Sequence, residues 1–124
     1  GNIKVEVFNK NNIEIFGNKN EFSQVLMNLI INAKDAFIEN EINNPHVKIN
    51  VSEQKKRIKI EVLDNAGGIN SEIIEQIFNP YFTTKDKKGT GIGLYLSKVI
   101  IEDEMKGKIS VRNYNCGVNF IIVV

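Results

Sequence analysis

Three glycines fall on alternate positions in the segment GTGIGL, residues 89–94. Gly89, Gly91 and Gly93 expose backbone N–H groups and tolerate positive φ. The apolar spacing that follows predicts a helix from about Gly91 to Met105. A helix start adds unpaired N–H donors and a partial positive charge. Together these features indicate an anion site suited to phosphate, although a flexible loop with a glycine cap would share them.

The loop before these glycines carries hydroxyl groups and positive charge. Residues 78–90 contain Pro80 and predict a loop rather than a helix or strand. Its side chains could assist an anion site, or could simply form a solvated loop: Thr83, Thr84, Lys85, Lys87 and Lys88.

A second polar feature lies on a helix predicted from Glu21 to about Asn40, where Asn18 or Asn20 could be the N-cap. At 100° per residue, one stripe within about 40° of Asn28 contains only amide and carboxyl side chains: Gln24, Asn28, Asn32 and Asp35. Asn is a poor helix former, and a solvated face usually carries Lys, Glu and Arg. The stripe is therefore either an unusual solvated face or the wall of a cleft that holds a metal ion or a polar ligand.

Asp64 follows a strand whose apolar residues alternate with charged ones. Ile58, Ile60 and Val62 share one face, and continuing the alternation places Asp64 on that apolar side. A buried carboxylate needs donors or takes up a proton. The sequence Asp-Asn before Gly67 and Gly68 fits a capped turn. It also fits an external donor, such as an exocyclic amine on a flat ring lying against the glycines.

The elements around these residues predict one α+β domain. Beside the two helices above, Ser71 could cap a short helix that ends at Ile77, and Asn43-Asn44-Pro45 would end the long helix. Period-2 runs predict strands at residues 3–8, 13–16, 47–51, 58–62, 109–111 and 118–124. The expected architecture is a two-layer sandwich: a mixed, mostly antiparallel sheet of about five strands, covered on one face by about three helices.

Composition narrows the class of protein. The 124 residues suit a single domain, and a net charge of +1 shows no bias toward nucleic acid or a membrane surface. No apolar run approaches the roughly 18 residues that span a bilayer. The single cysteine, Cys116, excludes an internal disulfide and is expected to be a small core residue. The chain begins with Gly1 rather than Met, so we expect residues 1–124 to be one domain of a longer protein.

Four segments in order resemble the catalytic ATP-binding domain of bacterial sensor histidine kinases, which shares the Bergerat fold with gyrase, the Hsp90 chaperones and MutL. NLIINAKDAF (28–37) resembles the N box, and DNAGGI (64–69) the G1 box. IFNPYFTTK (77–85) is similar to the F box, and GTGIGL (89–94) to the G2 box. The NA-x-DA and FTTK forms look most like the nitrogen-regulation branch.

The resemblance implies that ATP and Mg²⁺ are the ligands. Asn32 would be a Mg²⁺ ligand, and Asn28 would lie close to the phosphates or to waters on the metal. Asp64 would accept a hydrogen bond from the adenine amino group, and Gly68 would lie under the ring. The remaining ATP-binding residues would be Ile69, Phe82, Thr83, Thr84, Lys85, Gly89, Thr90, Gly91, Gly93 and Leu94, and Phe78 would help Phe82 anchor the lid. Ala66 departs from the glycine that many G1 boxes carry, and Asp35 from a lysine in other branches, so we assign Asp35 no phosphate contact.

Within the superfamily, ATPases and related serine kinases carry Glu, a general base, at the position of Asn28. An amide cannot take a proton, whereas a neutral imidazole already offers a lone pair. The residues therefore favour transfer of the γ-phosphate to a histidine, with catalysis by Asn28 and Asn32 through positioning and charge neutralisation. The alternatives are a GHKL ATPase or chaperone-like module and a partner-binding pseudokinase.

The acceptor histidine is expected outside this chain. His46, the single histidine, lies in an Asn-Pro loop before a strand and lacks the following acidic helix of a phosphoacceptor. The expected partners are therefore a dimerisation and phosphoacceptor domain of the same protein and, through the full kinase, a response regulator. We expect a cytoplasmic domain without nucleic-acid or direct membrane contact, slow or absent ATP hydrolysis, and no autophosphorylation of the isolated domain.

Overall fold

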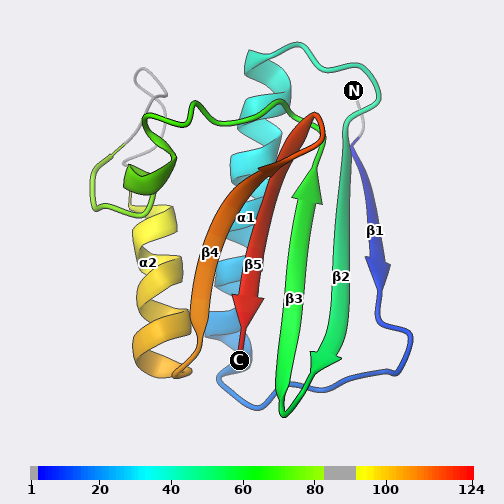
Figure 1. Ribbon diagram of the computed structural model, residues 1–124, viewed down its shortest axis with the longest axis vertical. Helices are drawn as coiled ribbons and strands as arrows, with labels where there is room; N and C mark the ends of the chain where they lie inside the picture. The colour runs from blue at the N-terminus through cyan, green and yellow to red at the C-terminus, as the bar shows by residue number, and fades with distance from the viewer. Residues whose placement is uncertain (1–2, 83–91) are drawn as a thin grey trace.

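The structure is a computed structural model that describes residues 3–82 and 92–124. Its five strands form one sheet in the order β1-β2-β3-β5-β4. β1 (Lys4–Phe8) runs parallel to β2 (His46–Gln54), and the other neighbours are antiparallel: β2 with β3 (Arg57–Asp64), β3 with β5 (Gly117–Val123), and β5 with β4 (Lys108–Tyr114). Both α-helices, α1 (Lys19–Glu39) and α2 (Gly93–Val99), cover the same face (Figure 1). The predicted α+β two-layer sandwich is confirmed.

The long helix α1 begins and ends at recognisable caps. Asn18 is the N-cap, because its side chain accepts a hydrogen bond from the Glu21 amide at 3.0 Å. At the other end Glu41 has φ +50°, its amide donates to Ile38 O, and the Ile42 amide donates to Phe37 O. This is a Schellman motif with Glu rather than the usual Gly in the left-handed position. The helix therefore ends before Pro45, and Asn40 is left as its last, half-helical residue.

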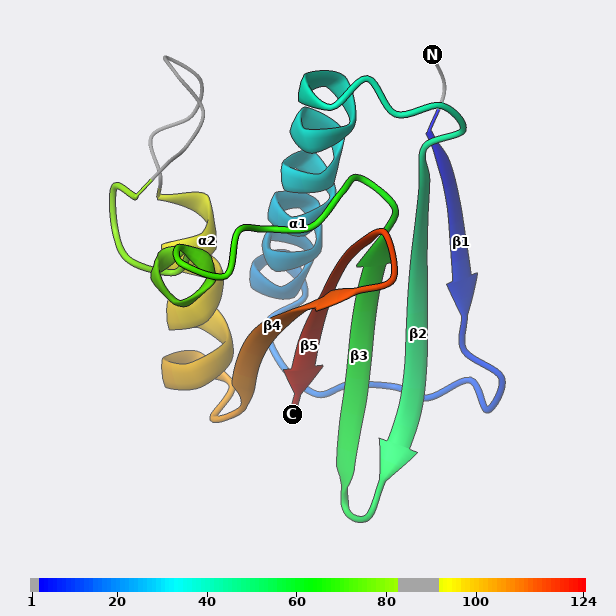
Figure 2. The same cartoon turned by 45° about the horizontal axis from the view of Figure 1, so that its top comes forward.

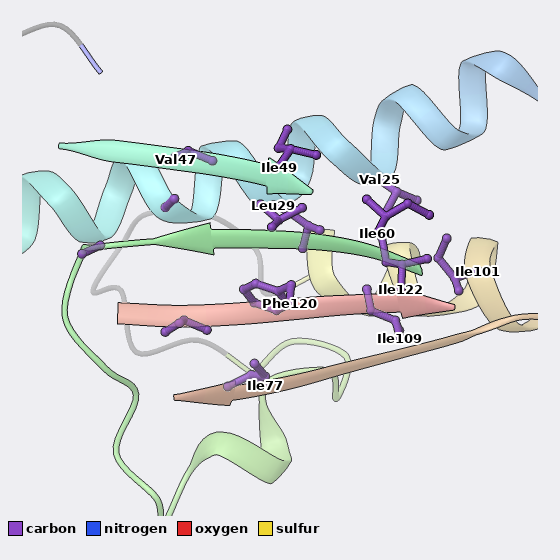
Figure 3. Close-up of a cluster of buried hydrophobic side chains, with 14 of the residues drawn as sticks. Val25, Leu29, Val47, Ile49, Ile60, Ile77, Ile101, Ile109, Phe120 and Ile122 are labelled. Atoms are coloured by element: carbon purple, nitrogen blue, oxygen red, sulfur yellow. The ribbon is translucent and has the colours of Figure 1, made fainter. Parts of the chain in front are cut away.

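The core lies between the helices and the inner face of the sheet (Figure 3). α1 contributes one residue per turn, which places a single apolar stripe on the strands: Val25, Leu29, Ala33 and Phe37. The three central strands supply the opposing layer: Val47, Ile49, Ile60, Val62, Val118, Phe120 and Ile122. This packing fixes which face of α1 points away from the sheet, and so fixes the direction of the polar stripe.

One predicted strand is wrong. Residues 13–16 do not join the sheet, although they alternate in polarity. The side chain of Asn9 accepts from the Ile13 amide at 2.8 Å and donates to the Ile13 carbonyl at 3.0 Å. Both backbone groups that a ladder would need at Ile13 are therefore already paired. Phe16 is 96% exposed, although Ile15 of the same segment packs against the core.

The predicted helix from Ser71 to Ile77 is also shorter than expected. It is a single 3₁₀ turn, η1 (Ile74–Gln76). The Glu72 amide donates a hydrogen bond to the side-chain oxygen of Asn70, and not to the predicted cap Ser71. The chain after α2 continues as one wide turn of π-helix, η2 (Ile100–Glu104). The described residues thus contain two α-helices, the second extended by the π-helical turn, and one short 3₁₀ turn where about three helices were expected. No helix among the described residues is both long and apolar enough to cross a membrane. Figure 2 shows α1 and α2 together on one face of the sheet.

Two single-residue expectations are corrected by the strand bounds. Cys116 is exposed rather than a core residue, because it lies in the two-residue turn between β4 and β5. His46 is the first residue of β2 rather than a loop residue, and its Nε2 lies 2.6 Å from Glu6 Oε1 on the neighbouring strand.

Candidate functional site

The side chain of Asn28 connects α1 to the start of α2. Its Nδ2 donates to Gly93 O and to Ser97 Oγ, both at 3.1 Å, and Ser97 Oγ donates to Gly93 O at 2.9 Å. Its Oδ1 accepts from Gln24 Nε2 at 2.8 Å. Two residues predicted separately for the site, Asn28 and Gly93, are therefore in direct contact.

The polar stripe of α1 lies at the margin of the packed interior. Asn28, Asn32 and Asp35 are half-buried, and Gln24 is exposed. The flanking Met27 and Ile31 are 52% and 46% exposed. A fully solvated face would leave the shorter amides open to water on all sides, so half-burial favours the interpretation of a cleft wall.

The turn after β3 forms hydrogen bonds with residues of several other elements. Asn40, at the end of α1, donates through Nδ2 to Ala66 O at 2.6 Å, and the Gly67 amide donates to Cys116 O at 2.8 Å. Gly67 has φ +92°, a conformation that glycine adopts readily. Ala66 is buried, with 1% of its surface exposed, and its backbone does not adopt the positive φ that would favour glycine.

Asp64 lies on the apolar side of β3, as the alternation predicts. Its Oδ1 accepts from the amides of Ala66 at 3.0 Å and Val118 at 3.3 Å. Burial raises the pKa of this carboxyl above its ordinary value, and the two backbone hydrogen bonds partly oppose that rise. Within the described residues, Oδ2 accepts no hydrogen bond, so it keeps its full capacity for an external donor.

The side chain of Asn113, near the end of β4, pairs with both backbone groups of Ile69. Its Oδ1 accepts from the Ile69 amide at 2.7 Å, and its Nδ2 donates to the Ile69 carbonyl at 2.8 Å. A Cβ on Gly68 would come within 2.9 Å of Asn113 Oδ1. The glycine at 68 therefore allows the amide of Asn113 to close over the turn.

The other predicted site residues divide into two groups. Ile69, Phe82 and Leu94 are half-buried and pack against the core. Phe78 does the same, and its ring meets Phe120 edge-on at a centroid distance of 6.1 Å. The rest lie outside the described residues: Thr83, Thr84, Lys85, Gly89, Thr90 and Gly91.

Three residues that hold these segments were missed from the sequence: Asn40, Ser97 and Asn113. Ser97 is fully buried, on the same helix face as Leu94 and Ile101, and a serine among apolar residues was a detectable signal. Asn113 also broke a pattern, because Asn is uncommon in strands. For Asn40 no local signal existed, since its role depends on where the helix ends.

A hollow of about 440 Å³ lies on the opposite, helix-free face of the sheet. Lys48, Leu63, Asn119 and Arg112 line it in one row, because the register pairs Lys48 with Leu63, Leu63 with Asn119, and Asn119 with Arg112. It reaches Asp64 and Cys116 from behind the turn. The hollow is thus separated by the sheet from the polar stripe of α1.

The donor set at the candidate site is rich in amides and poor in acids. Among residues 3–82 and 92–124, no group of three or more His, Cys, Asp or Glu side chains could hold a metal ion. The stripe carries amide oxygens and the Asp35 carboxylate, hard donors that Mg²⁺ accepts when phosphate oxygens and water complete its shell. These residues fit a Mg²⁺ ion that arrives with a nucleotide.

Comparison with known proteins places the chain in a family. Residues 17–124 match the profile described as histidine kinase-, DNA gyrase B- and HSP90-like ATPase. A protein of Halalkalibacterium halodurans, named a probable C4-dicarboxylate sensor kinase, is 39% identical over 99 residues, which are 79% of this chain and 18% of that protein. An NtrY-like sensor histidine kinase of Rickettsia bellii is 33% identical over 97 residues, 78% of this chain and 15% of that protein. The chain therefore spans less than a fifth of either relative.

Solved structures agree with the profile. The catalytic domain of histidine kinase ThkA superposes with a TM-score of 0.80 at 35% identity, covering 98% of this chain and 76% of that one. ThkA in complex with the response regulator TrrA superposes with a TM-score of 0.74 at 30% identity, covering 98% of this chain and 34% of that one. The chain therefore belongs to the histidine kinase-, DNA gyrase B- and HSP90-like ATPase family, as the catalytic domain of a bacterial sensor histidine kinase.

Proposed function

We propose that this domain binds Mg·ATP and donates the γ-phosphate to a histidine on a separate dimerisation domain. The observation that carries the proposal is that α1 contacts both other site segments. Asn28 holds the start of α2, and Asn40, twelve residues later, holds the turn after Asp64. Twelve helical residues correspond to about 18 Å. That length suits an elongated ligand with a ring at one end and phosphates at the other.

The adenine ring would lie at the turn after β3. Asp64 Oδ2 would accept from the exocyclic amine of adenine, since Oδ1 already accepts two backbone amides. Guanine presents an acceptor at the matching position, so it would face the carboxylate without a hydrogen bond. Gly68 would leave room for the ring, and Ile69 would contribute apolar contact.

The phosphates would lie between the amide stripe and the start of α2. Gly93 is the last of the predicted G2 glycines, and a Cβ there would make ordinary contacts, 3.7–3.9 Å, with Asn28. Among the described residues, no close contact at position 93 requires glycine, and a phosphate that approaches the backbone closely would make use of the missing side chain. Bound Mg²⁺, with Asn32 among its ligands, would neutralise charge on the transferring group.

Transfer to histidine suits a site without a carboxylate base. Asn28 occupies the position one turn before Asn32 and is engaged by Gln24, Gly93 and Ser97. Its amide cannot remove a proton, and a neutral imidazole nucleophile does not need it to. Asn28 would instead hold the phosphate-binding segment in place against α1.

The acceptor domain and the response regulator would be supplied by the rest of the protein and its partner. Residues 1–124 would be the catalytic domain alone, and the sensor and dimerisation domains would lie elsewhere in the longer chain. ThkA has been solved with a response regulator, which supports the same kind of partner for the kinase that contains this domain.

The test is a titration of ATP, ADP and GTP, each with and without Mg²⁺, on the wild type and on Asp64→Asn. We expect adenine nucleotides to bind specifically and the variant to lose about 100-fold in affinity, because an amide nitrogen replaces the acceptor and the charge is lost. GTP binding as tightly as ATP would overturn the role of Asp64.

Stability measurements separate lost binding from lost folding. The raised pKa means that the folded state binds the Asp64 proton more tightly than the unfolded state, so the charged carboxylate lowers stability at neutral pH and this cost fades as pH falls through the raised pKa. Asp64→Asn keeps Oδ1 for the two backbone amides and carries no charge. We therefore expect the variant to be at least as stable as the wild type at pH 7, with the difference shrinking in acid.

A further inference from the structure

We propose that Asn113 is a positioning residue that sets the adenine-binding turn and thereby the selectivity for adenine over guanine. The inference rests on the proposed nucleotide site and adds a determinant on β4, outside the four segments that the sequence singled out. Asn113 would act through the backbone of residues 68–69 rather than by touching the reacting atoms.

The geometry of the contact is that of a strand pair. One side-chain amide satisfies both the N–H and the C=O of Ile69, at 2.7 and 2.8 Å, across 44 positions of sequence. The N–H belongs to the peptide unit before the Ile69 Cα and the C=O to the unit after it, so the two bonds hold both peptide units that flank this residue. A single hydrogen bond would leave one of the two units unrestrained by Asn113.

The contact acts on the segment that would face the ring. Ile69 follows directly on Gly68, and Asp64 begins the same turn. The first part of this turn has its own anchors, namely Asn40 to Ala66 O and the Gly67 amide to Cys116 O. The pair with Asn113 is the hydrogen bonding that the structure gives the last residue of the turn. Removing it would free residues 68–69 while the Asp64 end stays held.

The side chain of Asn113 occupies the space beside Gly68. A Cβ at this position would lie 2.9 Å from Asn113 Oδ1 and 3.3 Å from its Cγ. Gly68 has no positive φ that would itself demand glycine. An alanine at position 68 would therefore have to displace the Asn113 side chain, and with it the pair of hydrogen bonds to Ile69.

The experiment compares ADP and GDP affinity in the wild type, Asn113→Ala and Asn113→Asp. Asn113→Ala should weaken ADP binding about tenfold, the equivalent of one to two lost hydrogen bonds. The affinity for GDP should not change, so the ratio of the affinity for ADP to the affinity for GDP falls. Asn113→Asp keeps an acceptor for the Ile69 amide but loses the donor to its carbonyl, and should fall between the two. Arg112→Ala, an exposed neighbour on β4, is the matched control and should keep the wild-type ratio.

A second measurement does not depend on nucleotide. In the free domain, amide hydrogen exchange at Ile69 should be faster in Asn113→Ala than in the wild type and should stay slow in Asn113→Asp. A double-mutant cycle then tests the link to Gly68: Gly68→Ala should weaken ADP binding in the wild type and cost clearly less in the Asn113→Ala background.

The outcomes are distinct. An unchanged ADP to GDP ratio in Asn113→Ala, or an equal loss for both nucleotides, overturns the inference, as does a cost of Gly68→Ala that is the same in both backgrounds. If the wild type binds no adenine nucleotide at all, the proposed function fails, and the exchange data alone then report whether Asn113 holds the turn.

Discussion

The two ends of the candidate site are built differently. The turn after Asp64 receives hydrogen bonds from the end of α1, from the β4–β5 turn, from β4 and from the β5 backbone. Among residues 3–82 and 92–124, the side chain of Asn28 joins the start of α2 to α1 by two hydrogen bonds. The end proposed for the adenine ring (the ring end) thus receives hydrogen bonds from four separate elements, whereas at the end proposed for the phosphates (the phosphate end) Asn28 and Ser97 join two helices. We therefore expect a substitution at Asn28 to loosen the phosphate end and to leave the ring end in place.

The largest effect should come from a substitution at the crowded end. A Cβ on Gly117 would overlap the carbonyl of Asp64, which is backbone and cannot rotate away. Gly117→Ala should therefore lower the free energy of unfolding by about 3 kcal/mol, measured by urea denaturation. Gly93→Ala is the matched substitution at the other end, where the Cβ would meet Asn28 at ordinary distances and no closer atom of the described residues, and it should change stability by less than about 1 kcal/mol. Equal losses would erase the distinction between the ends.

Removal of the amide at the phosphate end should have an intermediate effect. Asn28→Ala loses the bonds to Gly93 O and Ser97 Oγ and should cost about 2 kcal/mol of unfolding free energy. Ser97→Ala keeps the bond from Asn28 to Gly93 O and should cost about 1 kcal/mol. Amide exchange at Gly67 should remain slow in both variants, because its partner is Cys116 O. Faster exchange there would show that the two ends are coupled rather than independent.

The smallest expected effect is a slight gain in thermal stability. Glu41 holds the left-handed position of the Schellman motif, which favours glycine by about 1 kcal/mol. Glu41→Gly should raise the thermal midpoint slightly and leave ADP affinity unchanged, because Asn40 keeps its place at the end of α1. Glu39→Gly, inside the last helical turn, is the control and should lower the midpoint. A loss of affinity in Glu41→Gly would mean that the helix end, and not Asn40 alone, positions the turn.

The fold was largely predictable because periodicity reports burial directly. The apolar stripe of α1 and the alternation in β2 and β3 reflect the packing of the helix layer on one face of the sheet. The strand expected at residues 13–16 failed for a local reason, since the side chain of Asn9 pairs with Ile13 and no periodicity reveals such a bond. Cys116 was misplaced because a run that reads as apolar included a turn between two strands.

The sequence predicted individual residues of the candidate site but not the hydrogen bonds that hold its segments together. Asn28, Asp64 and Gly93 stood out because polar residues or glycines interrupted an apolar pattern. The contacts from Asn40 and Asn113 to the turn join residues 26 and 44 positions apart. Such pairs depend on the sheet order and on where a helix ends, and one sequence specifies neither in advance.

The single thiol of the chain occupies a useful position. Cys116 is exposed and lines the hollow on the helix-free face, while its carbonyl oxygen accepts the Gly67 amide at 2.8 Å. A maleimide dye attached to this sulfur would lie in the hollow on the helix-free face, next to the residue that hydrogen-bonds to Gly67. It would not enter the space on the helix side of the sheet, where we propose that the nucleotide binds. Because no second cysteine competes for the label, the domain carries a built-in attachment point for a fluorescence reporter of ligand arrival.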